Sequence, residues 1–567
     1  MQMTGAQILM HSLIDQGVEV VFGYPGGQAI IIFDALYEMR DKIRHVLVSH
    51  EQGGAHTADG YYRSTGKPGV MIATSGPGAT NLVTGIATAY HDSIPLVAIT
   101  GNVPRASIGL TSFQEVDIVS ITRPIVKRNY FVEDIATLSD TVREAFEIAN
   151  SGRKGPVLID VPKDITAMKA EYVPAPRFSV RPATSPPEET IRRAARQIAE
   201  AKRPVIYCGG GVTFSDSAEA LTAFAEKIQA PVCMSMMGLT SLPSGSPYNM
   251  GLVGMHGTLT ANMMVGKCDL LLAVGARFSD RVAGNPSSFA RGATVIHIDI
   301  DKAEISKNVP VDIALVGHAG ECLKRLTDLV PQVSRSPWLH EVLQHKAMNP
   351  LPHHPGAPDD VNPREVVSAL RQIGGADLIV ATDVGQHQML VAQYYPFARP
   401  RSFLSSCGLG TMGYGMGAAN GAAIGNPGRP VALVTGDGSF HMDMQEFAVT
   451  VTNNLPVVVV VMNNRVLGMV HQWQKLFFGG RYSGTELNSK TDFVKLAEAF
   501  GGTGMRIEKR KDIQPVLQKA FSLNGPCVVE VVIDANERVF PFIPPGASTE
   551  EALFFEEFPD ENAHEAK

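Results

Sequence analysis

Short apolar runs rich in β-branched residues recur along the chain between helical stretches. They lie at 46–48, 70–73, 96–99 and 157–161 in the first third, at 205–208, 270–274 and 295–300 in the second, and at 378–381, 431–434, 457–461 and 528–533 in the last. This alternation is typical of parallel sheets covered by helices on both faces. The sequence therefore predicts an α/β protein with three doubly wound parallel-sheet domains.

Two proline-rich polar stretches, 174–187 and 349–363, interrupt this series. Proline has no backbone N–H to donate, so neither stretch can continue a helix or strand. We place the domains at 1–173, 188–345 and 362–549. An acidic tail with interspersed phenylalanines follows at 550–567, and it could be a lid, a subunit contact or a solvated end.

Charge and cysteine usage narrow the class of protein. The net charge of −7 leaves no basic field to attract nucleic acid or anionic lipid. The six cysteines show no CxxC pairs, which is typical of reduced thiols rather than disulfides or a zinc site. The N-terminus does not resemble a signal peptide, and the longest apolar run, 455–462, is too short to cross a bilayer. We expect a soluble, cytoplasmic protein that binds neither nucleic acid nor membrane.

Ligands of doubly wound sheets bind beyond the carboxyl ends of strands. The sequence Gly-Asp-Gly-Ser at 436–439 follows one apolar run, and Asn-Asn at 463–464 follows the next. Carboxylate and amide oxygens suit a Mg²⁺ ion that also binds phosphate, and glycines let the backbone approach a diphosphate. Each sequence alone commonly marks a turn. With 24 residues between Gly438 and Asn463, the pair resembles the fingerprint of thiamine diphosphate enzymes, which implies that Asp437, the Asn464 side chain and the Val466 carbonyl bind the metal.

Thiamine chemistry also requires removal of the thiazolium C2 proton, so an acid must tune the aminopyrimidine ring. Glu51 follows the apolar run 46–48 within the sequence Ser-His-Glu-Gln. A lone glutamate there is usually a solvated surface acid, but the match to the family's HEQ sequence implies that Glu51 hydrogen-bonds N1′ of the pyrimidine. Glu51 and Asp437 lie in different predicted domains. In this family two subunits contribute them, which implies a homodimer or a dimer of dimers with active sites at the subunit interface.

Almost the whole chain resembles the large catalytic subunits of acetohydroxyacid synthase, also called acetolactate synthase. The resemblance rests on motifs in family order: FGYPGG at 22–27, SHEQ at 49–52, TSGPGATN at 74–81, SFQE at 112–115, PKD at 162–164, GMHG at 254–257, DVGQHQM at 383–389, GLGTMGYG at 408–415 and LGMVHQWQ at 467–474. It implies decarboxylation of pyruvate on thiamine diphosphate and transfer of the hydroxyethyl group to a second pyruvate or to 2-oxobutanoate. The products, 2-acetolactate and 2-aceto-2-hydroxybutanoate, are early intermediates of branched-chain amino-acid biosynthesis. A bound FAD and a small regulatory subunit are also implied.

The resemblance assigns cofactor contacts by position. It implies a pyrimidine-binding N-terminal domain, a central FAD-binding domain and a diphosphate-binding C-terminal domain. Residues expected at thiamine diphosphate are Gly27, Gln386, His387, Gly410, Met412, Gly438, Ser439 and Met469. Met412 would bend the cofactor, although a methionine can also simply fill a core. Residues expected at FAD are Gly210, Arg281 and Asp299, although a glycine triplet alone is weak evidence for a nucleotide.

Substrate residues follow from the same resemblance. Trp473 would favour 2-oxobutanoate over pyruvate, since a methylene in an apolar pocket contributes about 1–3 kcal/mol, and Arg281 suits the acceptor carboxylate. A plain core role remains open for Trp473. Residues expected in the active-site channel are Gln114 and Lys163, as catalytic groups, and Phe113 at the entrance; Lys163 could equally be a surface charge.

Departures from the family pattern occur at Gln28, Asn102 and Ser279, among other positions. None of these departures falls at Glu51, Asp437 or Asn464, so the expected thiamine chemistry is unaffected. Acceptor preference and flavin affinity stay open. A related thiamine diphosphate carboligase or decarboxylase with another acceptor, including one without flavin, is the main alternative. A non-catalytic regulatory protein is a remote alternative, because decay of function would not preserve Glu51, Asp437 and Asn464 together.

Overall fold

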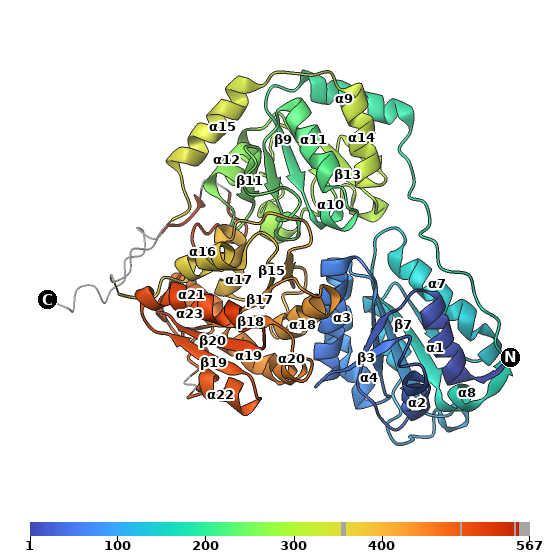
Figure 1. Cartoon of the computed structure of the whole chain (residues 1–567). Coiled ribbons are helices and arrows are strands. Elements are labelled where there is room, and N and C mark those ends of the chain that lie inside the picture. Colours follow the sequence, from blue (N-terminus) through green and yellow to red (C-terminus); the bar gives the residue numbers. More distant parts are fainter. Residues whose placement is uncertain (353–358, 488–489, 549–550, 555–567) are drawn as a thin grey trace.

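The computed structural model describes residues 1–352, 359–487, 490–548 and 551–554, and contains three six-stranded parallel sheets flanked by helices (Figure 1). The N-terminal sheet has the strand order β3 (Arg44–Leu47), β2 (Val20–Gly23), β4 (Gly69–Ala73), β5 (Leu96–Asn102), β7 (Val157–Pro162) and β6 (Arg128–Phe131). Its helices are α1 (Gly5–Asp15), α2 (Ile30–Glu38), α3 (Glu51–Thr65), α4 (Pro77–Asn81), α5 (Val83–Asp92), α6 (Ile118–Thr122), α7 (Leu138–Asn150) and α8 (Lys163–Ala167). β1 (Gln2–Thr4) and β8 (Lys169–Glu171) form a small antiparallel pair.

Alternate residues of these strands enter two different cores. Val70 and Ile72 of β4 pack with α1, α2 and α7 on one face, whereas Met71 and Ala73 pack with α3 and α5 on the other. This is the two-residue period of a strand covered on both faces.

The central sheet has the order β11 (Asn249–Leu252), β10 (Val232–Met234), β9 (Pro204–Cys208), β12 (Leu270–Val274), β13 (Thr294–Asp299) and β14 (Ile313–Val316). Its helices are α9 (Glu188–Glu200), α10 (Gly210–Phe214), α11 (Ala218–Ile228), α12 (Leu259–Lys267), α13 (Asp280–Ala283), α14 (Ala319–Leu329) and α15 (Ser336–Met348). This domain lies at the top of Figure 1, above the other two.

The C-terminal sheet has the order β16 (Phe403–Ser405), β15 (Ile379–Thr382), β17 (Val431–Gly436), β18 (Val457–Asn463), β20 (Cys527–Val532) and β19 (Thr503–Ile507). Its helices are α16 (Pro363–Gly374), α17 (Gln386–Tyr394), α18 (Gly415–Gly425), α19 (Asp437–Asp443), α20 (Phe447–Thr452), α21 (Gly468–Phe477), α22 (Phe493–Ala499) and α23 (Ile513–Ser522).

The N- and C-terminal domains meet where α3 packs against α18 (Figure 1). α18 consists largely of glycine and alanine, and this composition lets the two backbones touch. A Cβ on Gly421 would lie 2.0 Å from the carbonyl oxygen of Thr57, and one on Gly60 would lie 2.3 Å from that of Ala418. The sequence of α18 is therefore set by close helix packing.

The structure confirms the α/β class and the three parallel sheets. Every apolar run expected as a strand overlaps one, while the strands β1, β2, β6, β8, β10, β11, β14, β16 and β19 were missed. Residues 172–187 carry no helix or strand. The second proline-rich stretch and the acidic tail fall partly outside the described residues. In the described part of the chain, no helix is long and apolar enough to cross a membrane.

Candidate active site

One cavity of about 1600 Å³ is lined mainly by residues of the central and C-terminal domains, and residues of the N-terminal domain, including Asp92, also line it. A typical site for one small ligand measures about 300–1,000 Å³. The cavity is therefore large enough for more than one bound group.

The C-terminal domain contributes the carboxyl ends of β15, β17 and β18, which are neighbours in the sheet. The turns after them carry His387, Asp437 and Asn464, and all three line the cavity. The strand ends thus bring together residues 77 positions apart in the sequence, from 387 to 464.

Asp437 is the first residue of α19 and is buried. Its Oδ2 atom has no hydrogen-bond partner among the described residues, and burial raises the pKa of the carboxyl to about 6. Asn464 lies beside it in the cavity wall, and its Oδ1 accepts a hydrogen bond from the backbone N–H of Val466 at 3.2 Å. A buried carboxylate oxygen without a partner fits a cation.

The described residues contain no cluster of three or more His, Cys, Asp or Glu side chains able to hold a metal. A cation at Asp437 would therefore need other oxygens, such as the Asn464 amide, a backbone carbonyl and a ligand phosphate. Mg²⁺ is commonly bound in this way, through one or two carboxylates and substrate phosphates.

Gln386 and His387 begin α17 at the same edge of the sheet. A Cβ on Gly436 would lie 3.0 Å from Nδ1 of His387, so the ring sits directly against the turn before Asp437. Burial lowers the pKa of His387 to about 3, and the ring is therefore neutral at physiological pH. Ser439 donates a hydrogen bond to the Val384 carbonyl at 3.1 Å, which fixes it at the same wall.

The loop 406–412 brings Gly410 and Met412 to the cavity. Gly410 has φ +72° and no atom within 4 Å of a built Cβ, so its outer face is open. The Met412 Cε lies 3.9 Å from a Cβ built on Gly438. This loop therefore stands opposite the turn that follows β17.

The central domain contributes the adjacent ends of β9, β12 and β13. Gly210 and Arg281 follow β9 and β12, Asp299 is the last residue of β13, and all three line the cavity. A Cβ on Gly211 would lie 2.6 Å from the Cα of Gly275, so any side chain is excluded there. The result is a cradle of bare backbone beside a carboxylate and a guanidinium.

Trp473 of α21 stands where the two halves of the cavity meet. Its ring centroid lies 5.7 Å from that of Phe542, and the Arg281 Cζ lies 6.0 Å from the Trp473 ring. Arg281 Nη1 also lies 3.5 Å from the Met255 sulfur, and the His256 ring lies 5.2 Å from Phe542. Sequence reasoning noted the GMHG motif but gave no role to Met255 or His256, and it missed Phe542.

Glu51 lies elsewhere, as the first residue of α3. Asn81 Nδ2 donates a hydrogen bond to Glu51 Oε2 at 3.0 Å, and a Cβ on Gly78 would lie 3.1 Å from Oε1. The carboxylate is buried, with 8% of its surface exposed. Asn81 belongs to a motif that the sequence displayed, but its pairing with Glu51 was not predicted.

Other residues expected at the site gather near Glu51. Lys163 Nζ donates to the Gly27 carbonyl at 3.0 Å. Gln114 has φ +63° and packs against Gly76, two residues from Gly78. We call Gly27, Glu51, Asn81, Gln114 and Lys163 the Glu51 cluster. Phe113, beside it, is 84% exposed.

No member of the Glu51 cluster is among the described residues that line the cavity. Gly210, Arg281, Asp299, Gln386, His387, Gly410, Met412, Asp437, Gly438, Ser439, Asn464, Val466, Met469 and Trp473 all do line it. One copy of the chain therefore brings these cavity-lining residues together but leaves the Glu51 cluster outside the cavity.

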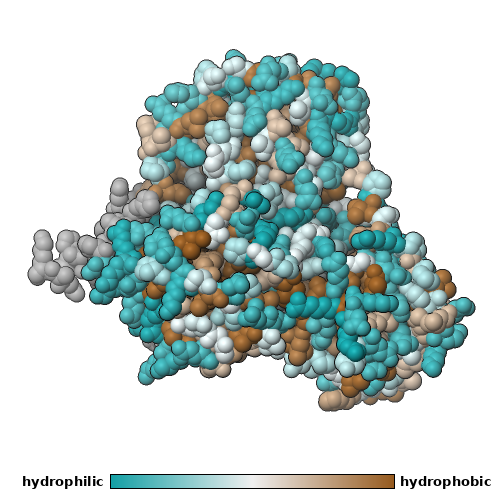
Figure 2. Space-filling model, in the orientation of Figure 1, coloured by the Kyte–Doolittle hydropathy of each residue, from teal (hydrophilic) through white to brown (hydrophobic). Residues whose placement is uncertain are grey.

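A space-filling view shows apolar patches interrupting the polar surface over the lower half of the molecule (Figure 2).

Family models match one segment in each of the three domains, and known proteins match nearly the full length. Residues 3–121 match the N-terminal TPP binding domain of thiamine pyrophosphate enzymes, residues 191–326 their central domain, and residues 383–531 their C-terminal TPP binding domain. The chain is 42% identical to the acetolactate synthase large subunit of Haemophilus influenzae, over 97% of this chain and 98% of that protein. It is 43% identical to the isozyme 3 large subunit of Escherichia coli, over 95% and 96%, and 43% identical to the isozyme 2 large subunit, over 97% and 99%.

Proposed function

Because this chain belongs to the acetolactate synthase large-subunit family of thiamine pyrophosphate enzymes, we propose that it decarboxylates pyruvate and transfers the two-carbon unit to a second 2-oxo acid. Pyruvate as acceptor gives 2-acetolactate, and 2-oxobutanoate gives 2-aceto-2-hydroxybutanoate. The observation that supports this best is that Asp437, Met412 and Trp473 line one cavity.

Thiamine diphosphate, Mg²⁺ and FAD are the cofactors of this family. When bound, thiamine diphosphate would supply an acidic carbon that, once deprotonated, is nucleophilic toward the keto carbon of a 2-oxo acid. In this chain Asp437, Asn464 and the Val466 carbonyl would hold Mg²⁺, which the buried, unpaired Oδ2 of Asp437 supports.

The diphosphate would lie against Gln386, His387, Gly438 and Ser439, all of which line the cavity. A neutral His387 can donate one hydrogen bond to phosphate without adding charge. Gly410, Met412 and Met469 would contact the rest of the cofactor. The open face of Gly410 supports a close approach of a flat ring.

Glu51 would hold the proton at the pyrimidine N1′, with Asn81 fixing the carboxylate. Since the Glu51 cluster stays apart from the cavity of its own chain, a second copy would supply it, in a homodimer or a dimer of dimers. The exposed Phe113 would then lie at the entrance to the partner's cavity, next to Gln114, Lys163 and Gly27.

FAD would lie on the bare backbone of the central domain, against Gly210, Arg281 and Asp299. The net reaction transfers a carbon unit without oxidation, so the flavin has no redox step in it. The acceptor carboxylate would pair with Arg281, and its alkyl group would meet Trp473, which lies within reach of that guanidinium.

Assembly and organisation complete the proposal. The matched relatives are named large subunits, which supports a small regulatory partner for this chain. We propose the domain division 1–173, 188–345 and 362–549, and a cytoplasmic location.

Product analysis tests this function. The purified protein is incubated with thiamine diphosphate, Mg²⁺, FAD and equal concentrations of pyruvate and 2-oxobutanoate. The products are then separated and their relative amounts are measured. We expect mostly 2-aceto-2-hydroxybutanoate. 2-Acetolactate alone would point to a catabolic relative, while free aldehyde or no turnover would contradict the proposal. A colourless protein that is fully active without FAD would show that FAD is not a cofactor of this chain.

A further inference from the structure

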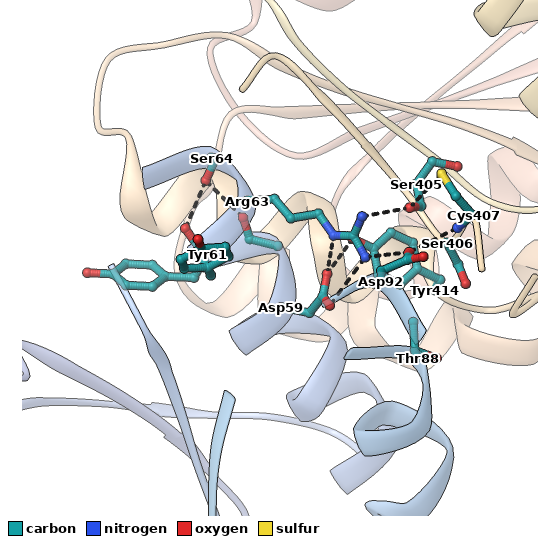
Figure 3. Close-up of polar contacts among 12 residues, drawn as sticks. Asp59, Tyr61, Arg63, Ser64, Thr88, Asp92, Ser405, Ser406, Cys407 and Tyr414 are labelled. Carbon is teal, nitrogen blue, oxygen red and sulfur yellow. Dashed lines mark hydrogen bonds and ion pairs between the residues drawn. The ribbon is translucent and has the colours of Figure 1, made fainter. Parts of the chain in front are cut away.

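A buried charge network joins the N-terminal domain to the loop 406–412, which carries Gly410 and Met412 (Figure 3). Its members are Asp59 and Arg63 on α3 and Asp92 on α5, each with at most 2% of its surface exposed. Tyr414 donates a hydrogen bond to Asp59 at 2.7 Å. The network lies outside the metal and substrate residues described above.

Asp92 occupies an unfavourable position for a carboxylate. It is the last residue of α5, where the helix dipole presents its negative end. Three donors from elsewhere compensate. The backbone N–H groups of Gly408 and Cys407 donate to its two oxygens at 2.7 and 3.0 Å, and Arg63 Nη2 donates at 2.8 Å. A carboxylate kept at such a locally unfavourable position usually has a functional role that compensates for its cost.

Arg63 spreads its donors over both domains. Its Nε donates to Asp59 at 2.6 Å, and its Nη1 donates to the Ser405 carbonyl at 3.0 Å. Although burial lowers it, the pKa of Arg63 is raised overall by Asp59, Tyr414 and Asp92, so the guanidinium stays charged. Two carboxylates share this one cation, and the backbone N–H groups of the loop supply the missing compensation. Losing them would leave a buried carboxylate short of donors, which is costly.

A second anchor lies one helical turn earlier on α5. The hydroxyls of Thr88 and Thr411 lie 2.7 Å apart, and Thr411 N–H donates to Ser406 Oγ at 3.0 Å. Gly408 fits only as glycine, because a Cβ there would lie 2.8 Å from Asp92 Oδ1. Helix α5 therefore holds the loop near both ends, with Gly410 between the anchors.

We propose that Asp92, oriented by Arg63, is a positioning residue that holds the loop 406–412 in the conformation in which Gly410 and Met412 meet thiamine diphosphate. This rests on the proposed function. It assigns to the N-terminal domain a second role, in the cavity of its own chain, besides the Glu51 cluster that it offers to the partner.

The test compares Asp92→Asn with Asp59→Asn in the full-length protein. An asparagine at 92 turns one acceptor into a donor that faces a backbone N–H group, whereas an asparagine at 59 removes a charge from the same network without touching the loop. Hydrogen exchange of the amides of 406–412 is measured on protein stripped of cofactors. We expect exchange at least about 10-fold faster in Asp92→Asn, and near wild type in Asp59→Asn.

Calorimetric titration with thiamine diphosphate and Mg²⁺ gives the second readout, and we expect a Kd raised about 10-fold or more in Asp92→Asn alone. Equal exchange and equal Kd in the two variants would overturn the proposal. If Asp92→Asn does not fold, Thr88→Val removes the other anchor, and we expect faster exchange at Thr411; unchanged exchange there would also overturn it. Because exchange needs neither cofactor nor substrate, a protein that forms no acetolactate but shows this difference contradicts the proposed function and leaves the positioning role intact.

Discussion

The Gln472 side chain pairs with the backbone of Val539 on both sides: its Nε2 donates to the carbonyl at 3.0 Å, and its Oε1 accepts from the N–H at 2.9 Å. The same Oε1 accepts a hydrogen bond from Gln386 Nε2 at 3.0 Å. Gln472 directly precedes Trp473, and Val539 lies three residues before Phe542. Gln472 thus links the segments that carry Trp473 and Phe542, which we call the substrate wall, to Gln386 at the expected diphosphate site.

We predict that Gln472→Leu loosens this wall. The buried N–H and carbonyl of Val539 would lose their partners, at a cost of about 1–3 kcal/mol in the free energy of unfolding. The preference for 2-oxobutanoate over pyruvate should fall about 3-fold to 10-fold. Competition between the two acceptors measures it, with the exposed Gln514→Leu as control. An unchanged product ratio in a less stable protein would show that Gln472 supports the fold alone.

Trp473→Leu should reduce the same preference more strongly. The smaller side chain no longer fills the pocket against the extra methylene, which is worth about 1–3 kcal/mol, or about 10-fold or more in the ratio of kcat/KM values. The control is Trp338→Phe at the chain's other tryptophan, which hydrogen-bonds the Pro204 carbonyl in the central domain. A ratio that moves equally in both variants would argue for a general packing effect.

Asp437→Asn should raise the Mg²⁺ concentration needed for half-maximal activity by at least about 10-fold, since a neutral amide replaces the only carboxylate expected at the ion. A Mg²⁺ titration at fixed thiamine diphosphate measures this. Asp377→Asn, at a half-exposed carboxylate paired with Arg399, is the matched control. Equal Mg²⁺ dependence in both variants would place the metal elsewhere.

His56 gives a prediction for pH. It is fully buried on α3, next to the Tyr414 ring, and burial, with a smaller effect of Arg63, lowers its pKa from 6.5 to about 3. Between these values the unfolded chain binds a proton that the folded chain excludes. The free energy of unfolding is therefore unaffected by His56 at pH 7.5. It falls as the pH drops below 6.5, and the loss due to His56 is about 1.4 kcal/mol at pH 5.5.

His56→Gln should remove this part of the acid sensitivity. We compare urea unfolding at pH 7.5 and 5.5 within each variant, so that any constant effect of the substitution cancels. The exposed His340→Gln should retain the full loss seen in the wild type. If His56→Gln loses as much stability as the wild type over this range, His56 is not the group that titrates.

Much of the fold followed from the sequence because the long central strands are continuous apolar runs, such as β18. Most strands at the sheet edges were missed, although β3 was expected, and the short interior strands β2 and β10 were missed as well. β6 and β19 each pair on one side only and carry polar or half-exposed residues, so they lack the signal of a buried strand. The family resemblance and the class of reaction are confirmed by relatives matched over nearly the full chain.

Of the site, the motifs marked which turns carry chemistry, but not which distant residues support them. Asn81 reaches Glu51 across 30 positions, and Gln472 reaches Val539 across 67. Such pairs depend on how helices pack over the sheets, and no local pattern encodes them. The individual roles of the site residues remain predictions.

The central claim is that each active site combines the Glu51 cluster of one copy with the cavity of another. Co-expression of a Glu51→Gln chain and an Asp437→Asn chain, each with its own tag, allows the mixed dimers to be purified and assayed. At a Mg²⁺ concentration that just saturates the wild type, each variant alone should show little activity, whereas the mixed dimer should regain one intact site and about half of the wild-type activity. Pairing the double variant with a wild-type chain should abolish activity. The opposite result, an inactive mixed dimer and a half-active double-variant pair, would place the whole site in one chain and contradict the claim.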